Sequence, residues 1–526
     1  MPERPLSVRS ARWRGADWQA WALLGLGLAF GTAFTWLNVL KLRSFFFFEF
    51  EDAAVEGQLL FNLATSGRFV QTLFHTGLPD HFWPVAYLIA PFYALHPSLE
   101  TWYALVSFSY GFCAVPFYLI ARDLAGSKRI GLAVGLAYLA YAPMHYLALG
   151  GVDGGRNFAL PALAAAVYFM HAGSLRGYCA AALVACMCKE DMPFVVAALG
   201  VYQAWKGMPR RWWLSSLLGA GAYFAVALVL LSTVFTQWPR EREVRVLGGI
   251  FYLDAQNFRH FAEMFAGHFR ESLSYLFHPS KVRALLLSLW PLAFLPFGAA
   301  ELLIALPSVA ELLLARVRFF NQNSDYLAPV VPLLFFALAH ALARIKRLRS
   351  ERAAAAAAWA VVALCASQHF TRSVLGCTAR ESGVLEDVAQ ADRRFEDVVS
   401  IFDRRLYRVD EEDRLGLALA GRIPREASVT ASGSFLPLLS GRRVLREFGF
   451  AKVYKTKEAR EAEEARAYAS DFVLIDRKCR TNGLGGRYPC PEPDEVDEEL
   501  RRLRTGFGYR VIEDDGTFAL LSRGAR

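Results

Sequence analysis

Residues 18–40 form an apolar stretch long enough to cross a membrane as one helix. Four arginines precede it within residues 1–17, and two further basic residues, Lys41 and Arg43, follow it directly. A cleavable signal peptide has a shorter apolar core and a small-residue cleavage site, so we interpret this stretch as an uncleaved anchor. Because positive charges are retained on the inner side, the basic N-terminus is predicted to be cytoplasmic.

Further apolar stretches follow the first one, and together they predict a polytopic α-helical membrane protein. The 526 residues are 55% hydrophobic and only 20% charged, whereas about a quarter of the residues of a soluble protein are charged. The basic loops between the stretches fall on the cytoplasmic side if the first span runs outward. We therefore predict about 11 transmembrane helices. The stretches after the first lie at 101–121, 129–147, 157–172, 177–188, 191–205, 212–235, 282–298, 300–316, 326–343 and 353–370.

This topology divides the chain into a transmembrane domain, residues 18–370, and a charged tail, residues 371–526. Within the transmembrane domain we expect a first external loop at 41–100 and a long external segment at 236–281, whose aromatic residues suit interfacial helices. An odd number of spans that starts inside ends outside. The tail is therefore predicted to lie outside the cytoplasm.

The tail has the pattern of a small soluble α/β domain. Short apolar runs alternate with a charged helical run, which is typical of strands packed against helices. Asp514, Asp515 and Gly516 separate the last two runs and predict a terminal hairpin. The expected strands lie at 427–433, 470–477, 509–515 and 517–523, and the expected helix at 458–468.

Two of the eight cysteines bracket a Gly-rich loop in the tail. Cys479 and Cys490 enclose the sequence CRTNGLGGRYPC, and a disulfide between them would close this loop in an oxidising compartment. A zinc site is the alternative, but no Cys-x-x-Cys pair or nearby histidine supports it.

An acidic cluster follows the first apolar stretch. Glu49, Glu51 and Asp52 lie next to four phenylalanines, and Glu56 and Gln58 come shortly after. Ionisable groups beside a membrane are costly and are candidates for function. Neighbouring carboxylates raise one another's pKa, which suits a general base or a pair of metal ligands. The alternative is an interfacial loop whose acids are simply solvated.

Two further motifs place charged or polar groups at the ends of apolar stretches. The sequence His81-Phe82-Trp83-Pro84 could bind phosphate or sugar, or form part of an interfacial aromatic belt. Lys189, Glu190 and Asp191 interrupt an apolar run, where a structural turn would use Gly, Ser or Asn. We interpret Lys189 as a partner for an anionic phosphate, and Glu190 or Asp191 as groups that orient it or bind a metal.

The candidate site is completed by groups on the same predicted side of the membrane. Asp52 and Glu51 are the candidate catalytic acids. Asp52, Glu190 and Asp191 could also hold a divalent metal ion, Mg²⁺ or Mn²⁺. No cofactor is otherwise indicated. The candidates for binding the donor phosphate or the rest of the substrate are His81, Lys189, Arg156, Gln58, Asp153 and Tyr326.

The order of these motifs resembles a bacterial family of predicted membrane proteins, domain of unknown function 2079 (DUF2079). The resemblance rests on Asp52 with Gln58, on HFWP at 81–84 and on KED at 189–191. It continues through PFYALHPS, VPFYLIAR, ALPSVAELLL and DYLAPVVPLLF into the tail, as IPREASVTASGSFLPLLSGRR and DFVLID.

The sequence departs from the family pattern in two places. Asp52-Ala53-Ala54 replaces an Asp-Leu-Gly-like start to the acidic motif, and Gly57 stands where the family has an aspartate before its Gln. The family's Asp-Phe-His-Pro motif is replaced by residues 152–156, which keep Asp153 but lack the histidine.

The family is similar to the glycosyltransferase C (GT-C) superfamily, whose members transfer a sugar from a polyprenyl phosphate outside the membrane. The resemblance implies a GT-C-like glycosyltransferase of the bacterial cytoplasmic (inner) membrane and cell envelope, with a first-loop acid as base. Its partners would be a polyprenyl-phosphate sugar, membrane lipid, and a glycan, lipid or protein acceptor. A transporter or flippase of a lipid-linked or polar solute, or a non-catalytic envelope assembly or sensor protein, is the alternative. The basic residues lie in inner loops, which argues against nucleic-acid binding.

Overall fold

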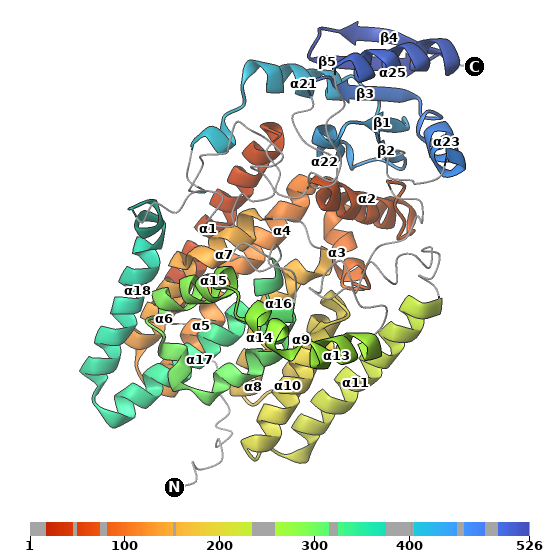
Figure 1. Cartoon of the computed structure of the whole chain (residues 1–526). Helices are drawn as coiled ribbons and strands as arrows, with labels where there is room; N and C mark the ends of the chain where they lie inside the picture. Colours follow the sequence, from red (N-terminus) through yellow and green to blue (C-terminus); the bar gives the residue numbers. More distant parts are fainter. Residues whose placement is uncertain are drawn as a thin grey trace.

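The structure, a computed structural model, consists of a helical body that carries a small β-sheet at one end (Figure 1). It describes residues 17–45, 50–73, 81–150, 154–233, 258–314, 325–374, 401, 404–449, 457–478 and 493–524.

Few helices of the body are long and apolar enough to cross a membrane alone. Within the described ranges these are α1 (Trp18–Arg43), the combined helix of α4 and α5 (Ala114–Ala125), which covers Leu99–Ala125, and α11 (Arg210–Thr233), which is apolar over Arg210–Leu231. A fourth span is formed if α6 (Lys128–Ala140) and α7 (Ala142–Leu149), which meet at a 45° bend, are counted together. The predicted count of about 11 spans is therefore not confirmed.

Three predicted spans correspond to helices that are too short to cross a bilayer core alone. The stretches at 157–172, 177–188 and 191–205 form helices of 13 or 14 residues, which is less than the roughly 20 residues that a bilayer core requires. These helices are α8 (Ala159–His171), α9 (Leu175–Cys188) and α10 (Met192–Trp205).

Two predicted spans, at 282–298 and 300–316, are wrong as continuous helices. The chain from α15 (Pro279–Leu289) to α16 (Leu306–Leu314) passes through three short 3-10 helices. Pro291 and Pro296 cannot donate the backbone hydrogen bonds that a helix interior needs, and Ala293 and Phe294 adopt left-handed backbone angles. These 3-10 helices are η3 (Trp290–Leu292), η4 (Leu295–Gly298) and η5 (Ala300–Ala305).

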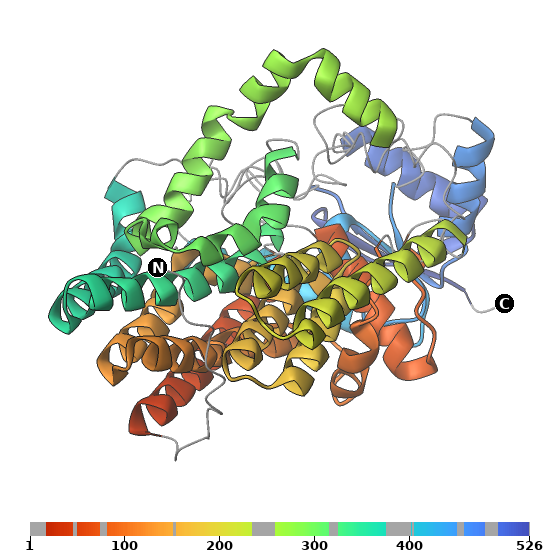
Figure 2. The same ribbon diagram turned by 90° about the horizontal axis from the view of Figure 1, so that it is seen from below.

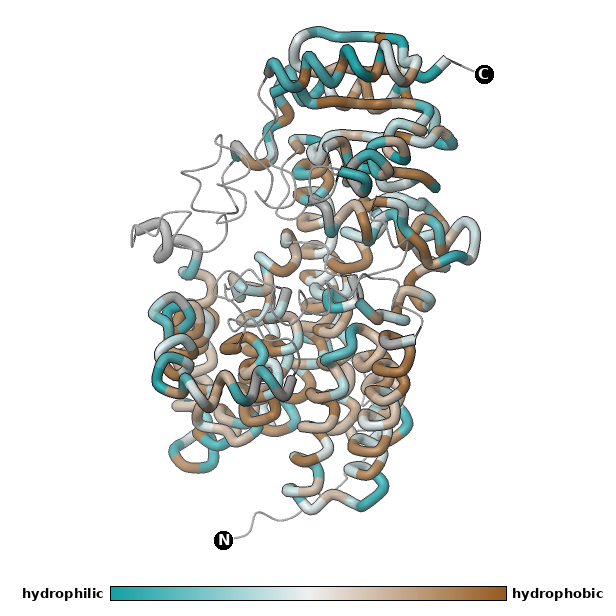
Figure 3. Tube along the Cα trace, turned by 45° about the vertical axis from the view of Figure 1, so that its right-hand side comes forward, coloured by the Kyte–Doolittle hydropathy of each residue, from teal (hydrophilic) through white to brown (hydrophobic). Residues whose placement is uncertain are grey.

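The outer helices expose large apolar side chains of the kind that a lipid bilayer covers. Trp18, Trp21 and Trp36 are exposed on α1, and Leu218 and Val229 are exposed on α11. Figure 3 shows hydrophobic residues along the chain throughout the helical body. Figure 2 shows α13 (Phe258–Gly267), α14 (Phe269–Leu276) and α15 as an arch along one side of the body.

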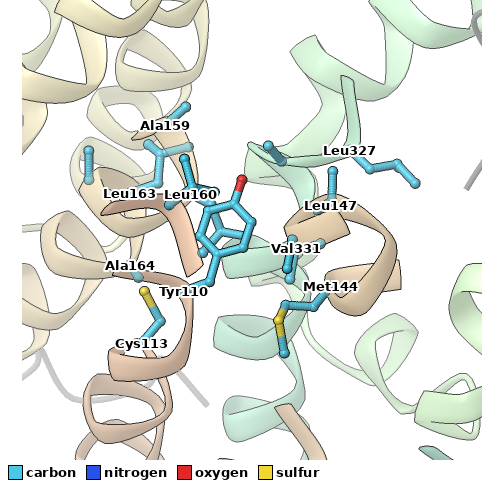
Figure 4. Close-up of a cluster of buried hydrophobic side chains, with 14 of the residues drawn as sticks. Tyr110, Cys113, Met144, Leu147, Ala159, Leu160, Leu163, Ala164, Leu327 and Val331 are labelled. Carbon is cyan, nitrogen blue, oxygen red and sulfur yellow. The ribbon is translucent and has the colours of Figure 1, made fainter. Parts of the chain in front are cut away.

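The inside of the body is a close-packed apolar core. On α1 and α4 (Leu99–Phe112), Gly27 and Gly111 meet so closely that a Cβ on Gly27 would lie 2.6 Å from the Gly111 carbonyl oxygen. Tyr110, Met144 and Leu160 belong to a buried cluster that joins α4, α7, α8 and α17 (Figure 4). Helices α17 (Val330–Leu348) and α18 (Glu351–Val374) complete the body.

The described part of the tail forms a small C-terminal sheet with helices. Its five strands are ordered β2-β1-β3-β5-β4; β1 is parallel to β2 and β3, and β5 is antiparallel to β3 and β4. All four predicted strands and the terminal hairpin are confirmed, and β2 is additional. The strands are β1 (Val429–Ala431), β2 (Leu445–Glu447), β3 (Phe472–Asp476), β4 (Tyr509–Asp514) and β5 (Phe518–Arg523).

Helices cover both faces of this sheet. One face packs against α23 (Lys457–Ala467), as predicted at 458–468, and α25 (Pro493–Gly506). The other face belongs to the same apolar core as the helical body and includes α21 (Glu411–Gly421) and α22 (Leu436–Leu439). The sheet domain is thus packed onto the end of the body that carries α2 (Phe50–Ser66) and α3 (Ala86–Tyr93) (Figure 1).

Candidate functional site

The three charges of the KED motif occupy a break between two helices. Helix α9 ends at Cys188, Lys189 has extended backbone angles, and Asp191 is the N-cap residue of α10. Pro193 follows in the first turn of α10, where its missing N–H is not needed. The helix break therefore turns all three side chains away from regular helical positions, toward the neighbouring segments.

Glu190 is fixed by the segment that leads into α3. His81 Nδ1 lies 2.7 Å from Glu190 Oε1, and the Phe82 N–H donates to Oε2 at 3.1 Å. Burial raises the pKa of the Glu190 carboxyl, but the charge and hydrogen bond of His81 and the charge of Lys189 outweigh it and lower the pKa to about 2. Glu190 is therefore a carboxylate at any physiological pH.

Arg156 lies at the centre of a second ionic group. Its Nη2 atom donates to Asp191 Oδ2 at 2.8 Å and to Glu311 Oε1 at 3.2 Å. Its guanidinium carbon lies 3.8 Å from the centroid of the Tyr326 ring, and Lys189 Nζ lies 5.6 Å from the same centroid. Guanidinium and ammonium groups over an aromatic face are stabilised by the ring quadrupole.

The acids lie on the outer side of this group and the cations on the inner side. The side chains of Asp191 and Glu311 are 20% and 25% exposed, whereas that of Arg156 is 2% exposed. Lys189 is also buried. His81 and Glu190 are partly exposed, as Asp191 and Glu311 are. We call these six residues the ionic cluster: His81, Arg156, Lys189, Glu190, Asp191 and Glu311.

Two glycines allow Arg156 to reach this position. A Cβ on Gly155 would lie 2.1 Å from the Cys188 carbonyl oxygen, and one on Gly154 would lie 2.9 Å from Glu56 Oε1. Gly154 also has a positive φ of 46°. The 3-10 helix η1 (Gly154–Phe158) therefore packs directly against the end of α9 and against α2.

Asp52 lies on α2 and is exposed to solvent. It precedes Glu56 by four residues, so the two carboxylates share one face of the helix. Glu56 is buried against Gly154, two residues from Arg156. The side chain of Glu51, Asp153, and the cysteines 479 and 490 lie outside the described residues.

Gln58 contacts the sheet domain and does not point to the ionic cluster. Its Oε1 accepts from the Thr72 N–H at 2.7 Å, and its Nε2 donates to the carbonyls of Arg442 and Arg443, each at 3.2 Å. Thr72 Oγ1 in turn donates to the Leu445 carbonyl at 2.8 Å. Gln58 thus joins the helical body to the sheet domain, and its amide faces these partners instead of the ionic cluster.

The described residues do not form a typical divalent-metal site. No three His, Cys, Asp or Glu side chains among them are grouped so that they could hold a metal ion together. Between Asp191 and Glu311, the place that a cation would take is filled by the Arg156 guanidinium. The geometry of these two acids therefore fits the arginine.

Glu311 is the member of the ionic cluster that the sequence analysis missed. It lies in α16, within a stretch that was predicted as a membrane span, and it contacts Arg156 from 155 positions away. The signal was a carboxylate inside an apolar run, which by itself marks a candidate for function.

Comparison with known proteins identifies the family. A family model described as "Predicted membrane protein (DUF2079)" matches residues 55–484, most of the chain. The chain belongs to this family. It is therefore a membrane protein, as the apolar stretches and the resemblance predicted. No curated protein matches the chain.

Solved structures similar to this member of the family include two of the oligosaccharyltransferase of Archaeoglobus fulgidus. The first, a complex with zinc and sulfate, is 12% identical with a TM-score of 0.39 and covers 94% of this chain and 73% of that chain. The second is tethered to an acceptor peptide through a disulfide bond. It is 10% identical with a TM-score of 0.36 and covers 86% of this chain and 69% of that chain.

Proposed function

We propose that this protein is an integral membrane glycosyltransferase that transfers a sugar from a polyprenyl-phosphate donor to an acceptor outside the cytoplasm. The observation that carries the proposal is the ionic cluster, in which buried Arg156 and Lys189 lie behind partly exposed acids. Segments far apart in the chain contribute to it. A cluster of ionised groups of this kind is costly beside apolar helices and marks a candidate for function.

The two buried cations suit the phosphate of the donor. Arg156 offers a planar guanidinium that can bind two phosphate oxygens at once, and Lys189 offers a compact positive charge next to it. Tyr326 supports both cations from one side. In this arrangement the lipid tail would lie along the apolar outer surface, with the phosphate at the ionic cluster.

Asp52 is the carboxylate best placed to act as the base. It is exposed on α2, one helical turn before Glu56, and Glu56 packs against Gly154 in the segment that carries Arg156. The Asp52 carboxylate would take the proton of the acceptor hydroxyl while the hydroxyl oxygen attacks the anomeric carbon of the sugar. The bond from that carbon to the phosphate oxygen then breaks, and the lipid phosphate leaves with both electrons, inverting the anomeric centre.

The sheet domain would guide the acceptor. It packs on α2 through α22 and through the Gln58 contact, so it lies next to the helix that carries Asp52. For this role residues 371–526 would lie outside the cytoplasm, at the bacterial inner membrane. The first loop would then face the same side.

A transporter or flippase of lipid-linked solutes is the rival function. The break between α9 and α10, with charges at the interruption, is also typical of substrate sites in transporters. The two functions differ in one product. A glycosyltransferase releases the lipid phosphate, whereas a transporter moves the donor and leaves it intact.

The test uses the full-length protein in lipid nanodiscs with polyprenyl-phosphate sugars and candidate acceptors. We expect release of polyprenyl phosphate by the wild type, its loss in Asp52→Asn, and its retention in Glu426→Gln. Glu426 is an exposed acid of the sheet domain and serves as the matched control. Movement of intact donor across a vesicle membrane without any release would favour the transporter.

A further inference from the structure

Two carboxyl groups compete for one nitrogen atom in the ionic cluster. Asp191 and Glu311 both contact Nη2 of Arg156, at 2.8 and 3.2 Å, so their oxygens lie within about 6 Å of each other. Like charges at this distance disfavour each other's ionised forms, and such a pair tends to share one proton.

The same two side chains cover Arg156. They are the more exposed partners, and the guanidinium behind them is almost fully buried. A phosphate that arrives from outside meets these two carboxylates first, and to bind Nη2 it must replace at least one of them. The displaced carboxylate loses its counter-charge next to a new anion, and a carboxylate in that position binds a proton more tightly.

We infer that binding of the donor phosphate at Arg156 is coupled to the uptake of one proton by the Asp191–Glu311 pair. The inference rests on the proposed function, since it concerns the phosphate of the same donor. It makes Glu311 a residue that sets the charge of the phosphate site, in addition to the two cations. Glu311 acts here through Arg156 and is a positioning residue, not a catalytic one.

The charged groups around Glu311 are consistent with this coupling. Arg156 reaches it from η1, and Asp191 and Lys189 face it from the break before α10. Tyr326 lies on η7 (Asp325–Leu327), and Lys281 on α15 donates to the carbonyl of Leu313 at the end of α16. Helix α10 itself has no charged residue. Glu301 on η5 is engaged by Lys206 and His340.

The protonation of the pair gives the direction of the pH dependence. Burial and the negative charge of Asp191 raise the pKa of Glu311 to about 8, against the opposing effect of Arg156. Helix α16, which carries Glu311, has nine residues and is too short to cross a bilayer core of about 20 residues. Below this pKa the Asp191–Glu311 pair already holds a proton, so phosphate binding takes up almost no further proton. Above it, each binding event takes up about one proton, and affinity falls by about tenfold per pH unit.

The experiment is calorimetric titration of the full-length protein in nanodiscs with a short-chain isoprenyl-phosphate sugar. This probe is a phosphodiester whose single charge is constant across the range used. Each titration is run in two buffers of different ionisation enthalpy, which yields the number of protons taken up. We expect about one proton for the wild type at about pH 9 and close to none at about pH 6.5.

Variants separate the pair from general effects. Glu311→Gln should still bind the probe but take up no proton at either pH, and its affinity should be nearly independent of pH. Asp191→Asn, which removes the other half of the pair, should also abolish the uptake. Glu426→Gln should behave as the wild type.

The outcomes distinguish the inference from the proposed function. Binding by the wild type without proton uptake at the higher pH would overturn the inference, as would uptake that persists in Glu311→Gln. Failure of the wild type to bind the probe would overturn it as well. If binding is coupled to proton uptake but no acceptor leads to release of lipid phosphate, the inference stands and the proposed glycosyltransferase activity is contradicted.

Discussion

His81 and Glu190 are 109 positions apart in the chain, yet His81 Nδ1 lies 2.7 Å from Glu190 Oε1. The contact joins the segment before α3 to the break between α9 and α10, and Val85 N–H adds a backbone bond to the Met187 carbonyl at 3.1 Å. Two motifs that looked independent in the sequence therefore form one wall of the ionic cluster.

This contact makes the stability of the protein sensitive to acid. The pKa of Glu190 is lowered to about 2, below the value of about 4.3 for an unfolded glutamate. A lowered pKa stabilises the folded state above the unfolded value, and this contribution is lost as the pH falls toward the folded value. We predict that the melting temperature of the wild type falls between about pH 4.5 and pH 2 more steeply than that of Glu190→Gln. Parallel curves for the two proteins would contradict the assignment.

Gly155 is predicted to tolerate no side chain. A Cβ there would lie 2.1 Å from the Cys188 carbonyl oxygen, a backbone atom that cannot rotate away. We expect Gly155→Ala to destabilise the protein by about 1–3 kcal/mol or more and to abolish donor binding. Gly25→Ala is the control, because a Cβ at this helical glycine meets no atom within 4 Å. Thermal melts and probe binding check both variants, and a stable, binding-competent Gly155→Ala would refute the packing argument.

Gln58 is predicted to hold the sheet domain on α2. Gln58→Ala removes the bonds to Thr72, Arg442 and Arg443 and leaves their buried groups without this partner. We expect faster hydrogen exchange in β2 while α1 and α4 keep their protection. Gln203→Ala is the matched control, because Gln203 is equally buried but bonds Ser216 within the body. Unchanged exchange in β2 would show that other contacts hold the domain.

Arg156 is predicted not to be replaceable by lysine. The guanidinium contacts two carboxylates and stacks on Tyr326, and an ammonium cannot reproduce this planar arrangement. We expect Arg156→Lys to weaken binding of the isoprenyl-phosphate probe by at least about tenfold, or about 1.4 kcal/mol. Arg344→Lys, at a surface arginine that bonds the Gly298 carbonyl, should bind as the wild type. Equal affinities would remove Arg156 from the phosphate site.

The sequence predicted five of the six residues of the ionic cluster but not how they pair. Ionisable groups next to apolar runs stand out because they are costly there, and this singled out His81, Arg156 and the KED motif. Their pairing depends on contacts between segments far apart in the chain, which local pattern does not reveal. Gln58 shows the reverse case: it was grouped with the acids by sequence proximity, but it is two residues past Glu56 on α2 and contacts the sheet domain.

The fold was predictable where local pattern decides it. The alternating runs of the tail gave four strands in the right places, whereas β2 has three residues, two of them charged, and leaves no such pattern. Apolar content alone could not separate spans from buried segments. The stretch at 282–316 is apolar, but its prolines and left-handed residues break it into short helices.

If Asp52 activates the acceptor for sugar transfer, the release of polyprenyl phosphate depends on its carboxylate. Full-length wild-type protein in nanodiscs should release lipid phosphate from a polyprenyl-phosphate sugar in the presence of acceptor. Folded Asp52→Asn, verified by its melting temperature, should lose this release by at least about a hundredfold. An Asp52→Asn protein that turns over at the wild-type rate would contradict the account.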